Sequence, residues 1–140
     1  MNIRNVQESD YDRVMEVMVE WWGGRDLRAR VYQGLFLHFR QTGFIVEDAR
    51  GKLMAFLLGY LSQTFAKEAY INWIGVHPGH RDQGIARILY ERFFEVARAH
   101  KRNRVTCGTA LENQASLRWH QHLGFSVEEK NGVYFFSREI

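Results

Sequence analysis

Apolar residues recur along the first part of the chain with the period of an amphipathic helix, after one short strand-like run at residues 3–6. Ser9 or Asp10 can cap the first helix, which we expect to stop at Gly23 because glycine suits the end of a helix. Asp26 can cap a second helix of the same kind. The apolar positions that define these two helices are Val14, Met15, Met18, Trp21, Trp22, Leu27, Val31, Leu35 and Phe39.

The middle of the chain reads as three strands followed by a long helix. Residues 44–46 and 53–61 flank a turn at residues 49–51 and predict a hairpin. A fourth strand at residues 69–76 leads into a loop rich in small and cationic residues. An amphipathic helix begins directly after this loop, at Ile85.

The last part of the chain predicts a strand at residues 105–109, a short helix at 114–122 and two strands joined by Asn131-Gly132. Asn-Gly between strand-like runs is a strong hairpin signal. The elements follow the order β-α-α-β-β-β-α-β-α-β-β. This order predicts an α/β fold with a mixed central sheet of about seven strands and four helices, parallel only where a helix crosses over. No repeat or linker divides the chain, so we expect a single domain over residues 1–140.

Composition narrows the class of protein. Hydrophobic residues make up 46% and charged residues 25%, as in ordinary globular domains. The net charge of +3 is a mild excess, so we expect no nucleic-acid partner and interpret the basic residues at 98–104 as a solvated helix end. One cysteine excludes an intrachain disulfide, and His77 and His80 lack a third ligand, so we expect no metal. No membrane-length apolar run and no signal segment are present, which predicts a cytoplasmic protein that does not bind membranes.

The most informative segment is the loop before the long helix. The first N–H groups of a helix have no internal partner, and the helix dipole adds positive charge there, so a diphosphate suits this end. Gly84 leaves the backbone open to phosphate oxygens, Ala86 keeps the next turn narrow, and Arg81 can add a forked cationic contact. Alone, Arg-x-x-Gly-x-Ala is a weak motif. The chain lacks Gly-x-x-x-x-Gly-Lys and Gly-x-Gly-x-x-Gly, which counts against an NTPase or a dinucleotide-dependent dehydrogenase.

Two motifs together resemble those of the GCN5-related N-acetyltransferase (GNAT) family. The family's strand end and phosphate loop, Val-x-Pro followed by (Gln/Arg)-x-x-Gly-x-(Gly/Ala), correspond to Val76, Pro78, Arg81, Gly84 and Ala86. Its later Asn-x-x-(Ala/Ser) segment leading to Gly-Phe corresponds to Asn113, Ser116, His120, Gly124 and Phe125. The order of elements agrees over essentially the whole chain. The resemblance implies a single N-acetyltransferase domain that transfers an acetyl group directly from acetyl-CoA to a primary amine of a small molecule or peptide.

The resemblance also implies where acetyl-CoA lies. The main chain of Ile74 and Val76 is expected to pair with the pantetheine arm, an amide near Val76 to face the thioester oxygen, and Asn113 to hydrogen-bond the arm. Ile74 and Val76 are equally expected core residues, and Asn113 is a natural helix N-cap. The cofactor-binding residues that we expect are Ile74, Val76, Arg81, Asp82, Gln83, Gly84, Ile85, Ala86, Asn113 and Ser116.

His120 stands where the family often has a tyrosine that protonates the departing thiolate. A histidine, with an ordinary pKa of about 6.5, can do this if it lies near the sulfur. The alternative is a partly buried histidine that supports the coenzyme pocket. His120 is therefore the expected catalytic residue, with a structural role left open.

The base that deprotonates the amine is not identified by the sequence. Strict alternation along the fourth strand places Tyr70 and Asn72 on the same face as Ile74 and Val76. Neither Tyr70 nor Asn72 is a base at neutral pH, although both can hold a water molecule. The carboxylates that could act at a distance are Glu20 and Glu68.

In the family, the loop between the first two helices forms one wall of the acceptor site. Neighbouring helix residues lie about 100° apart, so Trp21 and Trp22 cannot both face the core and one should be partly exposed. It can stack on a substrate while Arg25 pairs with a carboxylate, or it can pack the loop onto the body. With Tyr70 and Asn72, these are the substrate-binding residues that we expect.

Two further questions stay open at the level of sequence. The missing base and the missing tyrosine favour an alternative function, a non-catalytic acyl-CoA-binding sensor or regulatory module. The C-terminal hairpin can add an edge to a homodimer. The acceptor amine and the oligomeric state are not determined by these patterns.

Overall fold

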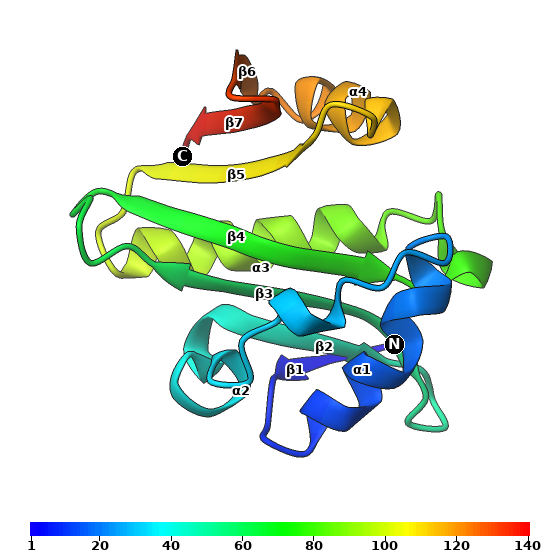
Figure 1. The fold of residues 1–140 in the computed structure, drawn as a ribbon. Coiled ribbons are helices and arrows are strands. Elements are labelled where there is room, and N and C mark those ends of the chain that lie inside the picture. Colours follow the sequence, from blue (N-terminus) through cyan, green and yellow to red (C-terminus); the bar gives the residue numbers. More distant parts are fainter.

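The structure, a computed structural model, describes residues 1–140 and is built on one seven-stranded sheet (Figure 1). In space the strands follow the order β1-β2-β3-β4-β5-β7-β6, and only β4 and β5 run parallel. The mixed sheet and the four helices confirm the predicted fold class. The strands are β1 (Asn2–Asn5), β2 (Gly43–Glu47), β3 (Leu53–Leu61), β4 (Glu68–Val76), β5 (Arg104–Ala110), β6 (Ser126–Lys130) and β7 (Val133–Glu139). The helices are α1 (Asp10–Trp21), α2 (Leu35–His38), α3 (Ile85–Ala99) and α4 (Gln114–His122).

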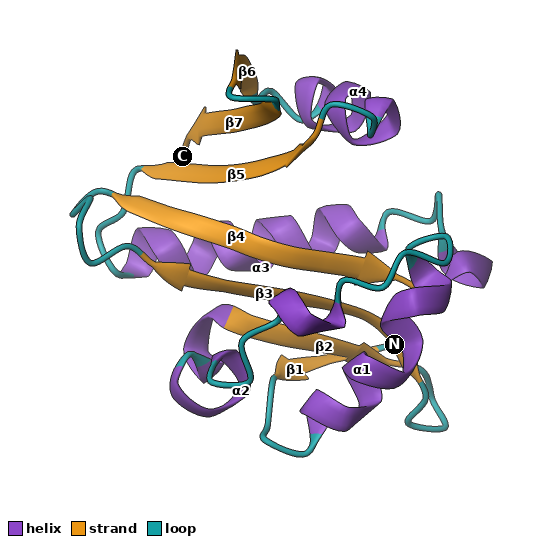
Figure 2. Ribbon diagram, in the orientation of Figure 1, coloured by secondary structure: helices purple, strands orange, loops and turns teal.

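Helices cover both faces of the sheet and create two buried clusters (Figure 2). One cluster joins α3 to the sheet through residues such as Leu89 and Phe93, and the other joins α1 and α2 to the opposite face. Strand β3 contributes to both, because Leu57 faces α3 while Phe56 and Leu58 face α1. A strand covered on both faces is apolar throughout, which explains the unbroken run at residues 53–61. None of the helices has both the length and the apolar character that crossing a membrane requires.

The first helix ends where the glycines predicted. Gly23 and Gly24 adopt positive φ angles of 66° and 89°, and their N–H groups donate to carbonyls of the last turn of α1. At the other end, Asp10 is buried and accepts hydrogen bonds from the guanidinium of Arg4 and from the N–H of Gln7. These contacts attach α1 to the edge of the sheet.

The prediction of a continuous second helix is wrong. The segment instead forms a 3-10 turn at Arg28–Arg30 and the four-residue helix α2. Gly34 lies against the ring of Tyr32, where a Cβ would come within 2.2 Å of a ring carbon. The apolar positions Val31 and Leu35 are nevertheless buried, so turns present them to the core as a helix would have done.

Strand β4 contains a bulge that reverses its alternation. Leu58 pairs with Trp73 and Gly59 pairs with Ile71, which leaves Asn72 without a partner on β3. Ile71 and Ile74 therefore both pack toward α3, whereas Tyr70 stacks on Tyr60 at the opposite face. The expectation that Tyr70, Asn72, Ile74 and Val76 share one face is wrong, because one extra residue shifts the period.

Strands β4 and β5 are hydrogen-bonded at one end only. Their pairing covers Glu68–Tyr70 against Arg104–Thr106 and then stops, and Figure 1 shows the two ribbons diverging toward the end of β4. The N–H of His77 donates to the carbonyl oxygen of Met54 on β3, so these two residues form a hydrogen-bonded pair of the ladder. The neighbouring pair, Ala55 with Val76, is therefore a non-hydrogen-bonded pair. By the alternation of an antiparallel ladder, the main-chain groups of Val76 and Ile74 point away from β3 into the opening.

Candidate active site

A cleft of about 360 Å³ lies where β4 ends, between the start of α3 and one side of α4. It brings together two segments far apart in the chain, the loop after β4 and the start of α4. Every expected cofactor-binding residue except Gln83 lines it, and so do His120 and Trp22. The expected residues that line it are Ile74, Val76, Arg81, Asp82, Gly84, Ile85, Ala86, Asn113 and Ser116.

The start of α3 offers a run of free backbone donors to this cleft. From Asp82 through Arg87, no backbone N–H has a hydrogen-bond partner within the protein. Asp82 and Gly84 have positive φ angles of 61° and 79°, a geometry that turns successive N–H groups into an anion-binding concavity. A Cβ built on Gly84 meets nothing within 4 Å, so the helix end is open. The site therefore fits the diphosphate of coenzyme A.

Arg81, the cation that we expected to bind that diphosphate, makes hydrogen bonds within the protein instead. The guanidinium of Arg81 donates to the carbonyls of Trp21 and Val76, and so ties the end of α1 to the end of β4. Arg87 also lines the cleft, is exposed, and has no hydrogen bond or ion pair in the structure. Its position in the first turn of α3 makes Arg87 the free cation of the site.

On the other wall, Asn113 caps α4. Its side-chain oxygen accepts from the N–H of Ser116 at 3.1 Å, and its amide nitrogen donates to Thr109 Oγ1 at 3.3 Å. The capping interpretation is thus confirmed, and the side chain still lines the cleft. Asn113 and Ile74 line the same cleft, so this geometry permits the expected hydrogen bond between Asn113 and the pantetheine arm.

His120 is buried, with a side chain enclosed by aromatic rings and polar contacts at both nitrogens. Its ring stacks on Phe136 at 4.2 Å between centroids. Nδ1 lies 2.8 Å from the carbonyl oxygen of Ser116, and Nε2 lies 2.9 Å from the hydroxyl of Tyr90 on α3. A carbonyl oxygen only accepts, so Nδ1 carries the hydrogen and the Tyr90 hydroxyl donates to Nε2.

This environment keeps His120 neutral. Burial lowers the pKa of His120 below its usual 6.5, and the hydrogen bond to the Ser116 carbonyl only partly opposes that effect. Tyr90 is fully enclosed, and burial raises the pKa of its phenol well above 10. Both groups are therefore uncharged at neutral pH.

The expected substrate-binding residues are scattered. Trp21 is 3% exposed and stacks on Phe56, so it belongs to the core, whereas Trp22 is the partly exposed member of the pair and stacks on Trp73. Arg25 is exposed and Asn72 half-buried, and neither lines the cleft. Tyr70 also lies outside the cleft, because the bulge turns it to the other face of the sheet.

No candidate base faces the cleft on β4. Glu20 is exposed on α1, and Glu68 lies 3.8 Å from the guanidinium of Arg104 at the paired end of β4 and β5. Sequence reasoning missed Arg87, His80, Gly75, Ala115 and Trp119 in the lining of the cleft. The available signal was helical spacing, since Arg87 follows Gly84 by three residues and Trp119 follows Ser116 by three.

Comparison with known proteins agrees with this geometry. The Acetyltransferase (GNAT) family matches residues 9–125. An uncharacterized N-acetyltransferase of Methanocaldococcus jannaschii is 28% identical over 138 residues, and the match covers 91% of this chain but only 61% of that relative's length.

Two solved structures share the fold. Ard1 from Thermoplasma volcanium superposes with a TM-score of 0.83 at 18% identity, covering 99% of this chain and 97% of that one. Diaminobutyrate acetyltransferase EctA from Paenibacillus lautus, solved with L-2,4-diaminobutyric acid and coenzyme A, superposes with a TM-score of 0.74 at 19% identity, covering 96% and 93%. With its motifs placed on this fold and most of its length matched, the chain belongs to the Acetyltransferase (GNAT) family.

Proposed function

We propose that the protein is an acetyl-CoA-dependent N-acetyltransferase that acts on a primary amine of a small molecule or peptide. The observation that carries this proposal is the run of unpartnered N–H groups from Asp82 to Arg87, which opens onto a cleft beside the free edge of β4. Family membership supports it, as does the coenzyme A held by the structurally similar EctA.

The chain's own groups divide the work of binding. The amides at the start of α3 and the guanidinium of Arg87 hold the diphosphate, while main-chain groups of Ile74 and Val76 pair with the pantetheine arm. The N–H groups of Ile74 and Val76 both point into the opening, where one of them stabilises negative charge on the thioester oxygen. Gln83 contributes through its free N–H rather than its side chain.

Acetyl-CoA supplies an acetyl thioester whose carbonyl carbon bonds to the amine nitrogen as its bond to sulfur breaks, so the nitrogen loses a proton and the sulfur gains one. Transfer is direct, because the sole cysteine, Cys107, is buried and burial raises the pKa of its thiol to about 12. A thiol held protonated at neutral pH is a poor nucleophile.

His120 is our proposed source of the proton for the leaving thiolate. Its Nδ1 hydrogen is held by Ser116, so a proton reaches the sulfur only by way of Nε2, where the Tyr90 hydroxyl lies. Tyr90 is fully enclosed and does not line the cleft, whereas His120 does, so Nε2 of the protonated His120 exchanges the Tyr90 oxygen for the sulfur and donates to it directly. In this arrangement His120 is the proton donor, and Tyr90 positions its ring before the transfer.

Thermal unfolding with acetyl-CoA tests the binding site. Acetyl-CoA at a hundred times its Kd stabilises the folded state by about 2.7 kcal/mol, and we expect Gly84→Glu to abolish this shift by placing a carboxylate among the phosphates. The matched control is Gly51→Glu, since Gly51 has nearly the same φ of 78° and an equally open surrounding but does not line the cleft. An unchanged melting temperature of the parent protein with millimolar acetyl-CoA would contradict the proposal.

One observation favours a second candidate function, a sensor that binds acyl-CoA without turnover. Both nitrogens of His120 are occupied within the protein, and no base lies on β4 beside the cleft. An assay of free thiol release across a panel of amines separates the two functions. Thiol released only when an amine is added supports the enzyme, whereas binding without release supports the sensor.

A further inference from the structure

A second cavity of about 500 Å³ lies on the sheet face opposite α3, under the β6–β7 hairpin; we call it the hairpin cavity. Tyr70 from β4 and Cys107 from β5 line it, so it opens over the place where the two strands begin to part. Its volume is that of a small-molecule site. No residue that lines the coenzyme cleft, Trp22 included, also lines the hairpin cavity, and Arg25 does not line it either.

Strand register explains the floor of the hairpin cavity. Tyr60 pairs with Tyr70, Tyr70 with Thr106, Thr106 with Ser137, and Ser137 with Ser126. These residues form one row across five strands, and all of them line the cavity. The floor therefore presents two stacked phenol rings at one end and hydroxyl groups at the other.

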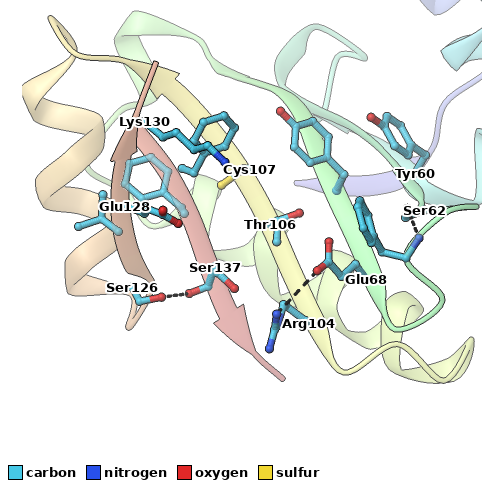
Figure 3. A pocket seen from close by; sticks show the side chains of 15 residues that line it. Tyr60, Ser62, Glu68, Arg104, Thr106, Cys107, Ser126, Glu128, Lys130 and Ser137 are labelled. Atoms are coloured by element: carbon cyan, nitrogen blue, oxygen red, sulfur yellow. Dashed lines mark hydrogen bonds and ion pairs between the residues drawn. The ribbon is translucent and has the colours of Figure 1, made fainter. Parts of the chain in front are cut away.

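Charges of both signs stand around this floor (Figure 3). Glu68 lies 3.8 Å from Arg104, so these two largely satisfy each other. Glu128 and Lys130 are spaced by two on β6, so their side chains share one face of the strand, and neither has an ion pair or hydrogen bond in the structure. Figure 3 shows both side chains among those that line the cavity, on the side of β6.

The rim is apolar. Phe65, Val127 and Phe135 are 60%, 36% and 44% exposed, and all three line the hairpin cavity. Exposed large apolar side chains gathered around one concave site mark a binding surface more strongly than single ones do. The cavity thus combines one unpaired cation, one unpaired carboxylate and a hydrophobic wall.

The two cavities are close neighbours through the interior of the protein. Cys107 lines the hairpin cavity and belongs to the same buried cluster as Tyr90, whose hydroxyl contacts His120 in the coenzyme cleft. Along β4, Tyr70 faces the hairpin cavity and Ile74 faces the cleft, four residues or about 13 Å apart. The opening between β4 and β5 begins beside Tyr70 and Thr106, so the hairpin cavity borders the end of the opening farthest from the phosphate loop.

We propose that the hairpin cavity binds the acceptor, and that the acceptor is an α-amino acid with an apolar side chain. Lys130 pairs with its carboxylate, Glu128 accepts hydrogen bonds from its amine, and the side chain lies over Tyr70 against Phe65. This inference rests on the proposed function and narrows its substrate. The balance of two cations and two carboxylates in the lining suits a zwitterion better than a polyamine or a polyanion.

Three probes that differ only at the carboxylate test the substrate class: L-phenylalanine, L-phenylalaninamide and phenethylamine. With saturating acetyl-CoA, we expect kcat/KM for L-phenylalanine to exceed the other two by about tenfold, as a charge-assisted hydrogen bond provides. Lys130→Gln should raise the KM for L-phenylalanine about tenfold and leave phenethylamine unchanged. Lys52→Gln, at an exposed turn position, is the matched control.

Glu128 and Phe65 are tested in the same assay. Glu128→Gln should raise the KM of all three amines, whereas Glu129→Gln, the exposed neighbour on the other face of β6, should not. Phe65→Ser should raise the KM for L-phenylalanine and leave that for glycine unchanged. Calorimetric titration of L-phenylalanine in the presence of coenzyme A measures the same losses as Kd and does not depend on turnover.

The outcomes separate this inference from the proposed function. Equal kcat/KM for the three probes, or a preference for the amide, overturns the amino-acid acceptor while the enzyme assignment stands; the second result indicates a peptide N-terminus. An unchanged KM in Lys130→Gln overturns the cavity assignment. Absence of acetyl-CoA binding overturns the proposed function itself, whatever L-phenylalanine does.

Discussion

The hydroxyl of Tyr90 donates a hydrogen bond of 2.9 Å to Nε2 of His120, and so joins α3 to α4 inside the core. The two residues stand 30 positions apart, in the two helices that carry the phosphate loop and the second family motif. Tyr90 also packs edge-on against Trp119 and Phe125, so the bond lies within an aromatic cluster that excludes water. Polar groups in such surroundings are costly to leave unpaired.

Tyr90→Phe should therefore destabilise the protein by about 1–3 kcal/mol, because it leaves Nε2 of His120 buried without a donor. Urea denaturation of the variant measures this. Tyr134→Phe is the control, since the Tyr134 hydroxyl accepts only an exposed hydrogen bond from Gln114 and should cost under about 0.5 kcal/mol. Equal losses in the two variants would show that the buried pair contributes nothing special.

The lowered pKa of His120 predicts a pH dependence of stability. Below pH 6.5 the unfolded chain binds a proton at this histidine that the folded protein does not, so the free energy of unfolding falls as the pH falls. This contribution is complete above pH 6.5 and is lost between 6.5 and the lowered pKa, with a slope of at most about 1.4 kcal/mol per pH unit.

His120→Gln removes that part of the slope, which urea titrations between pH 7.5 and pH 5 can measure as a difference from the parent protein. Lowered pKa values of Asp10 and Glu47 act below their ordinary 3.8 and 4.5, outside this range. Parallel pH profiles for parent and variant would be incompatible with a neutral, buried His120.

The turnover number, kcat, should also depend on His120. If His120 supplies the proton, His120→Phe lowers kcat by up to about a hundredfold and removes one ionisation from the pH dependence of kcat. Tyr90→Phe should keep that ionisation, because the imidazole remains. If His120→Phe keeps the parental pH profile, the histidine has a structural role only.

Arg87 should contribute long-range attraction to the coenzyme. Arg87→Gln removes the free cation beside the open end of α3, and we expect the Kd for acetyl-CoA to rise about threefold to tenfold at low salt and less at high salt. Titrations at two ionic strengths measure both effects. Arg98→Gln, an exposed change in the last turn of the same helix, should leave both values unchanged.

The coenzyme cleft could be predicted from the sequence because it depends on local rules. Helix starts, glycine conformations and N-caps are set within a few residues, so Gly84, Ile85 and Asn113 could be placed before the fold was known. The start of α3 and the start of α4 are about thirty residues apart in the chain. They lie together because they follow β4 and β5, the two strands that border the same opening.

The face of β4 could not be predicted, because its bulge depends on the neighbouring strand. Gly59 on β3 lies under the backbone of Tyr70, where a Cβ would come within 2.5 Å of the carbonyl oxygen. This glycine in the middle of an apolar strand was the available signal. Likewise, neighbouring tryptophans predict that one is exposed, but only the packing of Phe56 decides that Trp21 is the buried one.

The short pairing of β4 with β5 also has a mechanical consequence. Only three residue pairs form this seam, so the sheet consists of two plates hinged at the end marked by Tyr70 and Thr106. Val76 lies six residues, or about 20 Å, beyond the hinge, so a rotation of about 5° widens the far end by about 2 Å. Substitutions at the buried seam residues Ala69 and Val105, which line neither cavity, will therefore change how tightly the protein binds the coenzyme.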